Sequence, residues 1–273
     1  MSDAALIFLT LLVVLLTLSY WLTHRAENRQ LKASKQADTE IVQRCLDLLQ
    51  ALQKHRGLGA QQDAASVTLR NTQAQQLDQL WLNWPGASMQ LPPLQHHWPQ
   101  LRRKPADLDA HCRLIETLLT VIEQLEDRLY RQHHPRIRGL GEACRSLEDL
   151  ARLRGLAVRA ANYERCPPGL QMQLRFLCKR MLDQEQDSHL LALIERLQSD
   201  LIESAQIRLA PGECFALLTP LIEQRLQGIR LILDRNVEKI LHSPHLATKV
   251  HTKVLHERSG QHPRSCRSSR QGR

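Results

Sequence analysis

Hydrophobic positions recur along most of the chain at alternating intervals of three and four residues. One stripe runs from Val42 to Gly59, a second from Leu140 to Ala161 and a third from Phe215 to Ile240. Such intervals keep side chains on one face of a helix with 3.6 residues per turn. We therefore predict an all-α, antiparallel helical bundle. Its helices are expected at residues 37–58, 65–84, 106–132, 137–163, 169–186, 188–208 and 212–241.

Proline interrupts this pattern. Residues 85–105 contain five prolines, which cannot donate a backbone hydrogen bond, so we predict a loop there. The tryptophans in and before this segment are expected to pack around it; they are Trp81, Trp84 and Trp98. Pro220 is expected to kink or begin the last helix.

The first segment has the pattern of a membrane span. Ala4 to Thr23 contains no charged residue, and Tyr20 and Trp21 lie near its end. As a helix it would extend for roughly 30 Å, which matches the hydrocarbon thickness of a bilayer. A cleaved signal peptide is the alternative. It would require positive charge before the apolar run and small residues after it, and the chain has neither. Residues 1–24 are therefore predicted to be a transmembrane anchor.

Residues 25–36 form a basic juxtamembrane segment. They contain Arg25, Arg29, Lys32 and Lys35. Positive charge next to a span favours the cytoplasmic side. We expect a single-pass protein of the inner (cytoplasmic) membrane, with its N-terminus outside and residues 37–241 in the cytoplasm. Seven cysteines, an odd number, fit a reducing compartment.

Composition supports the helical prediction, and the charge distribution changes the choice of partner. The chain has 51 Leu and 26 Gln but few aromatic or β-branched residues. Of the net charge of +9, residues 242–273 carry +6, residues 1–35 carry +2 and the remainder carries +1. A nearly neutral body argues against nucleic acid as a partner. The basic tail, 242–273, is expected to be disordered and either simply solvated or bound to anionic lipid or an acidic protein.

Two of the stripes contain an arginine followed by glycine and leucine. Arg56-Gly57-Leu58 and Arg154-Gly155-Leu156 stand 98 residues apart, in an arrangement that looks like an internal repeat. A guanidinium on a core-facing stripe needs a partner, because burying its charge alone is costly. The partner could be a carboxylate from another helix, water reached along the side-chain stem, or a bound anion. Two such arginines facing each other would suit a small planar oxyanion.

The segment Leu49 to Ala60, which reads LQALQKHRGLGA, resembles the opening signature of nitrate- and nitrite-sensing (NIT) domains. That family is all-α and binds nitrate or nitrite between two helices, using an arginine and an adjacent main-chain amide from each. The resemblance implies that Arg56 and Gly57 form one half of the site and Arg154 and Gly155 the other. His55 stands where the family has Glu in its first motif, and Leu153 where it has Glu in its second.

No pattern typical of an enzyme, a cofactor site or a metal site is found in the sequence. We interpret the chain as a bacterial membrane-anchored sensor of nitrate or nitrite. Because too few residues remain for an output domain, the signal would pass to a separate signalling protein, through the last helix and tail or through homodimerisation. The alternative is a membrane-tethered scaffold that binds a protein and no small ligand.

Overall fold

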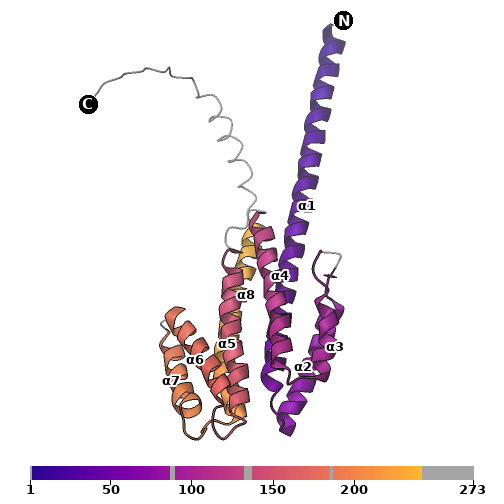
Figure 1. The fold of residues 1–273 in the computed structure, drawn as a ribbon. Helices are drawn as coiled ribbons and strands as arrows, with labels where there is room; N and C mark the ends of the chain where they lie inside the picture. The colour runs from indigo at the N-terminus through magenta and orange to yellow at the C-terminus, as the bar shows by residue number, and fades with distance from the viewer. Residues whose placement is uncertain (1, 87–89, 132–136, 185–186, 242–273) are drawn as a thin grey trace, which may run out of the picture.

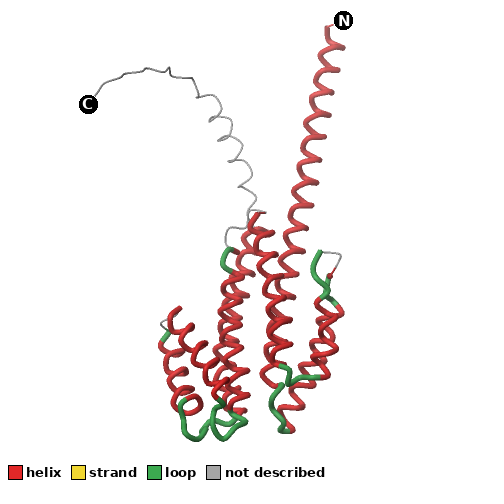
Figure 2. Tube along the Cα trace, viewed as in Figure 1, coloured by secondary structure: helices red, strands yellow, loops and turns green. Residues whose placement is uncertain are grey.

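The computed structural model of the chain describes residues 2–86, 90–131, 137–184 and 187–241. Its regular elements are all helical, and no strand occurs in these residues, so the all-α prediction is confirmed (Figure 2). The predicted tail, 242–273, lies outside the described residues. In chain order the elements are α1 (Ser2–Leu58), α2 (Ala64–Leu82), η2 (Leu94–His97), α3 (Trp98–Arg103), α4 (Leu108–Arg131), α5 (Leu140–Ala160), α6 (Pro168–Gln184), α7 (Ser188–Leu197), the π-helical turn η4 (Gln198–Ile202) and α8 (Pro211–Leu241).

Four of these helices form the centre of the bundle. The C-terminal part of α1 packs against α4, α5 and α8, and α5 also packs along α4 and α8. Helices α2 and α3 flank the α1 side, whereas α6 and α7 flank the α5 side (Figure 1). The helices α1 and α5, which carry the two arginine motifs, therefore lie in contact at the middle of the fold.

The predicted stripes supply the core of this bundle. On α1 the side chains of Val42, Cys45, Leu49 and Leu52 have no exposed surface. The described apolar residues of the second and third stripes are also buried or partly buried. Burial of such stripes is the main driving force for packing amphipathic helices together.

Helix α1 continues without a break from the predicted anchor into the bundle (Figure 1). Its side chains from Leu11 to Ser34 are exposed. Within the described part of the chain, no helix has a stretch that is both long and apolar enough to cross a bilayer. The predicted span includes residues 4–7, 9 and 10, whose side chains lie outside the described residues.

The prediction of a loop at residues 85–105 was wrong in part, because this segment contains η2 and α3. Pro99 lies in the first turn of α3, where its missing N–H costs no helical hydrogen bond. The tryptophans do pack here: Trp84 is buried and donates from Nε1 to the carbonyl of Pro92 at 3.0 Å. Trp98 donates to the Asp78 carboxylate at 2.7 Å.

Pro220 lies inside α8 and does not begin it, contrary to one of the two predicted alternatives. Three other helices begin with a side-chain cap. The side chains of Asp63, Asp107 and Asp187 accept backbone N–H groups at the starts of α2, α4 and α7.

Candidate functional site

The two arginine motifs meet where α1 and α5 cross. Arg56 is 3% exposed and Arg154 has no exposed surface. A methyl group placed on Gly57 would lie 3.1 Å from Nε of Arg154, and one placed on Gly155 would lie 3.6 Å from Nε of Arg56. Each arginine therefore lies against the glycine of the other helix. The fold brings together all four residues that the sequence predicted as a site.

Arg56 is held by a buried carboxylate. Its Nη1 and Nη2 atoms donate to Oε1 and Oε2 of Glu148 at 2.5 and 3.0 Å. Nη1 also contacts Sγ of Cys112 at 3.4 Å, and the amide of Gln53 donates to Glu148 at 3.1 Å. Burial opposes the charge on Arg56, but the Glu148 carboxylate outweighs it and holds the pKa of this guanidinium above its usual value. Of the alternatives left open by the sequence, Arg56 thus has a carboxylate partner from another helix.

The partners of Arg154 in the described part of the chain are neutral. Its Nη1 donates to the hydroxyl of Thr219 at 2.9 Å and its Nη2 to the main-chain carbonyl of Gln53 at 2.8 Å. The ring of Phe215 lies 4.5 Å from the guanidinium carbon. Burial and then the nearby charge of Arg56 lower the pKa of Arg154 to about 9, so it remains a cation at neutral pH. No carboxylate among the described residues lies within ion-pair distance of it.

The site therefore contains more positive than negative charge. For its two buried guanidinium groups, the described part of the chain supplies one carboxylate, Glu148, which pairs with Arg56. The Nε atoms of Arg56 and Arg154 are also buried and have no hydrogen-bond partner among the described residues. An unpaired buried charge and unused donors are both costly. An anion bound between the two groups would relieve both costs, and a planar oxyanion can accept two parallel N–H bonds from one guanidinium.

The glycines make this close crossing possible. A methyl group on Gly57 would lie 2.9 Å from Cε2 of Phe215, closer than carbon atoms normally approach. At Gly59, just after the end of α1, it would lie 2.0 Å from the carbonyl oxygen of Pro105. Gly155 has more room, with its nearest neighbours at 3.6 Å. The motif on α1 therefore depends more strongly on glycine than the motif on α5.

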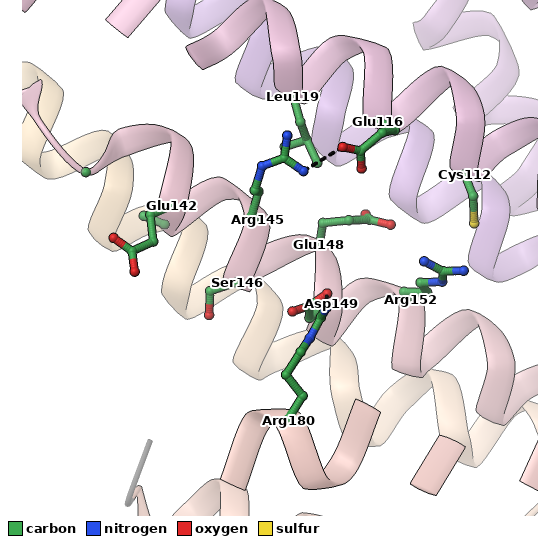
Figure 3. A pocket seen from close by; sticks show the side chains of 12 residues that line it. Cys112, Glu116, Leu119, Glu142, Arg145, Ser146, Glu148, Asp149, Arg152 and Arg180 are labelled. Carbon is green, nitrogen blue, oxygen red and sulfur yellow. Dashed lines mark hydrogen bonds and ion pairs between the residues drawn. The ribbon is translucent and has the colours of Figure 1, made fainter. Parts of the chain in front are cut away.

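A cleft of about 690 Å³ opens next to this site, between α4 and α5 with Arg180 of α6 at its edge (Figure 3). Its walls are strongly charged, and its lining includes Glu148 and Cys112, the two side chains that contact Arg56. The cleft thus reaches the immediate surroundings of the buried Arg56 guanidinium from the surface.

Two histidines next to Arg56 were not predicted from the sequence. His55 Nδ1 and His111 Nε2 lie 2.8 Å apart, and His111 Nδ1 lies 2.6 Å from the carbonyl of Asp107. Burial lowers the pKa of His55 to about 3 and that of His111 to about 4. Both rings are thus neutral at pH 7, and the His55 ring packs in a T-shaped arrangement against Trp98. Within the described part of the chain, no three His, Cys, Asp or Glu residues are grouped as a metal site would require.

Glu148 was also missed. It stands one position outside the predicted stripe, four residues after Cys144 and three before Ala151, so it belongs to the same helix face. The sequence signal that could have identified it is a carboxylate on the core-facing side of α5, the helix that carries Arg154.

Comparison with known proteins adds no further assignment. No protein-family model, no curated protein and no solved structure matches the chain.

Proposed function

We propose that the chain is a sensor that binds nitrate or nitrite between Arg56 and Arg154, with the adjacent Gly57 and Gly155 allowing the close approach. The observation that carries the proposal is the environment of Arg154, which is fully buried and has no carboxylate partner among the described residues. A monovalent planar anion matches both the excess charge and the two unused Nε donors. The resemblance of Leu49–Ala60 to the NIT signature points to the same ligands.

Binding would act on the packing of α1 against α5. An anion that contacts both guanidinium groups favours whichever arrangement brings them closest, by the difference in its affinity for the two arrangements. The change would pass along α1 or α8 to a separate signalling protein, or across a homodimer.

We also propose that residues 1–24 anchor the protein in the inner membrane, with residues 37–241 in the cytoplasm. Most of the described side chains of the span are apolar and exposed, among them Phe8, Leu16 and Trp21. Exposed apolar side chains at this density are expected where lipid surrounds a helix. Reporter fusions after residue 35 test the orientation: cytoplasmic activity is expected, and periplasmic activity would contradict it.

A second candidate function is a membrane-tethered scaffold without a small ligand. It is favoured by an apolar hollow of about 260 Å³ on α5 and α6, beside which Met172 and Phe176 are 70% and 63% exposed. Exposed large apolar side chains of this kind often mark a surface for protein binding.

Isothermal titration calorimetry on the full chain in detergent separates the two functions. Nitrate and nitrite are each titrated at constant ionic strength, with chloride and sulfate for comparison. Binding of nitrate or nitrite is expected, with loss in Arg56→Ala and in Arg154→Ala. Arg159→Ala is the matched control, because Arg159 is an exposed arginine on α5 outside the cleft. Absence of binding for all four anions would favour the scaffold.

A further inference from the structure

We propose that Glu148 is a movable counter-ion: an anion arriving through the α4–α5 cleft displaces it from Arg56, and Arg152 receives it. This inference rests on the proposed function, since it describes how the anion reaches the same arginine pair. It assigns the cleft as the route to the site and names Arg152 as a positioning residue.

Glu148 lies between the cleft and the guanidinium group of Arg56. Glu148 has a 10% exposed side chain and lines the cleft, whereas the side chain of its partner Arg56 has no exposed surface. The Arg56 guanidinium lies behind Glu148 and Cys112, the two cleft-lining residues that contact it. An anion coming from the cleft therefore meets Glu148 before it meets Arg56.

Glu148 and a bound oxyanion would compete for the same donor atoms of Arg56. Glu148 occupies both terminal nitrogens of Arg56, at 2.5 and 3.0 Å. A planar oxyanion binds a guanidinium through the same paired donors. Two negative groups bound to the same guanidinium group would also repel each other strongly in a buried site. Bidentate binding of the anion to Arg56 therefore requires Glu148 to leave.

Arg152 is placed where it could receive the displaced Glu148 carboxylate. Arg152 follows Glu148 by four residues on α5, and a Glu-to-Arg pair at this spacing is favourable on a helix surface. Arg152 lines the cleft, is exposed and has no ion-pair or hydrogen-bond partner among the described residues. Figure 3 shows the Glu148 carboxylate extending toward the side of the cleft where Arg152 lies.

The other two arginines of the cleft are already paired. Arg145 donates to Glu116 at 2.6 Å and to Glu123 at 2.5 and 3.0 Å. Arg180 forms an ion pair with Asp149. Arg152 is consequently the cleft arginine that can accept a displaced carboxylate without breaking another ion pair between described residues.

A double-mutant cycle tests the proposal, with nitrate affinity measured by calorimetry on the full chain in detergent. Glu148→Gln keeps the shape of the side chain but removes the competing charge, so nitrate is expected to bind at least about tenfold more tightly. Arg152→Gln removes the receiver and is expected to weaken nitrate binding about twofold, the size of a helical ion pair of this kind. In the Glu148→Gln background, Arg152→Gln should have no effect, because no carboxylate needs a receiver. Arg159→Gln is the control for loss of one positive charge on α5.

Several outcomes would overturn the proposal. Equal weakening by Arg152→Gln in both backgrounds would mean that Arg152 only attracts anions. If Glu148→Gln binds nitrate more weakly than the natural chain does, Glu148 itself contributes to the ligand site and is not displaced. Either result leaves the proposed function standing. Absence of anion binding by both the natural chain and Glu148→Gln would overturn the two together. If Glu148→Gln fails to fold, the exposed Arg152 still decides: no difference between Arg152→Gln and Arg159→Gln contradicts the inference.

Discussion

Arg56 and Arg154 occupy corresponding positions in two similar motifs, yet the fold treats their charges differently. Arg56 forms a bidentate pair with Glu148, and Arg154 contacts a hydroxyl, a carbonyl and an aromatic ring. Similar local sequence thus gives one neutralised cation and one that is not neutralised. The difference arises from the neighbouring helices: α5 supplies a carboxylate to Arg56, whereas the described residues of α1 and α8 supply a carbonyl and a hydroxyl to Arg154. Under the proposed function, this imbalance would attract the anion.

The largest expected difference between the two arginines is in stability. Arg56→Met leaves Glu148 buried without its partner and is expected to lower the free energy of unfolding by about 3–5 kcal/mol. Arg154→Met removes a buried charge that has no carboxylate partner among the described residues, so a change of only about 1 kcal/mol in either direction is expected. Thermal unfolding followed by circular dichroism in detergent measures both. Equal losses would mean that the charge of Arg154 is compensated as well as that of Arg56.

The histidine pair makes the Arg56 side sensitive to acid pH. The folded-state pKa values of His55 and His111, about 3 and about 4, lie below the ordinary value of 6.5. The unfolded chain therefore binds more protons below pH 6.5, and stability must fall as the pH drops from 6.5 toward 4. Two protons correspond to a slope of at most about 2.7 kcal/mol per pH unit.

Unfolding measured at several pH values between 4 and 7 tests this slope. His111→Gln should reduce it by about half, since one proton in two is removed. His189→Gln, which changes an exposed histidine, should leave it unchanged. An unaltered slope in His111→Gln would show that other groups cause the pH dependence.

The two glycines should differ in their tolerance of a methyl group. Gly57→Ala places its Cβ 2.9 Å from the Phe215 ring and 3.1 Å from Arg154 Nε, so a loss of about 1–3 kcal/mol is expected. Gly155→Ala has contacts no closer than 3.6 Å inside a helix, where alanine is favoured over glycine by about 0.5–1 kcal/mol. The same unfolding measurement should therefore show changes of opposite sign. Two losses of equal size would contradict the crossing geometry.

The smallest expected effect concerns Thr219, one of the neutral partners of Arg154. Thr219→Val keeps the side-chain shape and removes the hydroxyl that accepts from Arg154 at 2.9 Å. A loss of about 1–1.5 kcal/mol is expected, because the hydrogen bond is made by a charged group but lies in a partly buried place. Thr120→Val is the control: that hydroxyl is exposed and bonds only to the carbonyl of Glu116. Equal effects of both changes would show that Arg154 gains little from Thr219.

Much of the fold could be predicted from the sequence, because helical periodicity follows directly from the spacing of apolar residues. The elements η2 and α3 could not, since proline forbids a helix interior but is well suited to a first turn, and Pro99 stands there. The continuity of α1 was also missed. Three segments of different composition share that helix, and a change of composition is not a break in helical backbone.

The candidate site was predictable in its cations but not in its counter-ion. A buried arginine is noticeable on an apolar stripe, whereas Glu148 is one of many carboxylates beside a stripe. Only the crossing of α1 and α5 shows which of them meets Arg56. The neutral surroundings of Arg154 depend likewise on the position of α8, which periodicity within a single helix does not determine.

The unbroken path of α1 gives the arginine crossing a mechanical consequence. The helix has 57 residues and ends two residues after Arg56. At 1.5 Å per residue, about 80 Å of helix separates Arg56 from the N-terminal end, so a tilt of 1° about the crossing would move that end by about 1.4 Å. A stiff helix that pivots near one end works as a lever, in which a rotation of a few degrees at the crossing becomes a displacement of several ångströms at the far end. Small changes in how two guanidinium groups sit against two glycines would thus be magnified at the opposite end of the molecule.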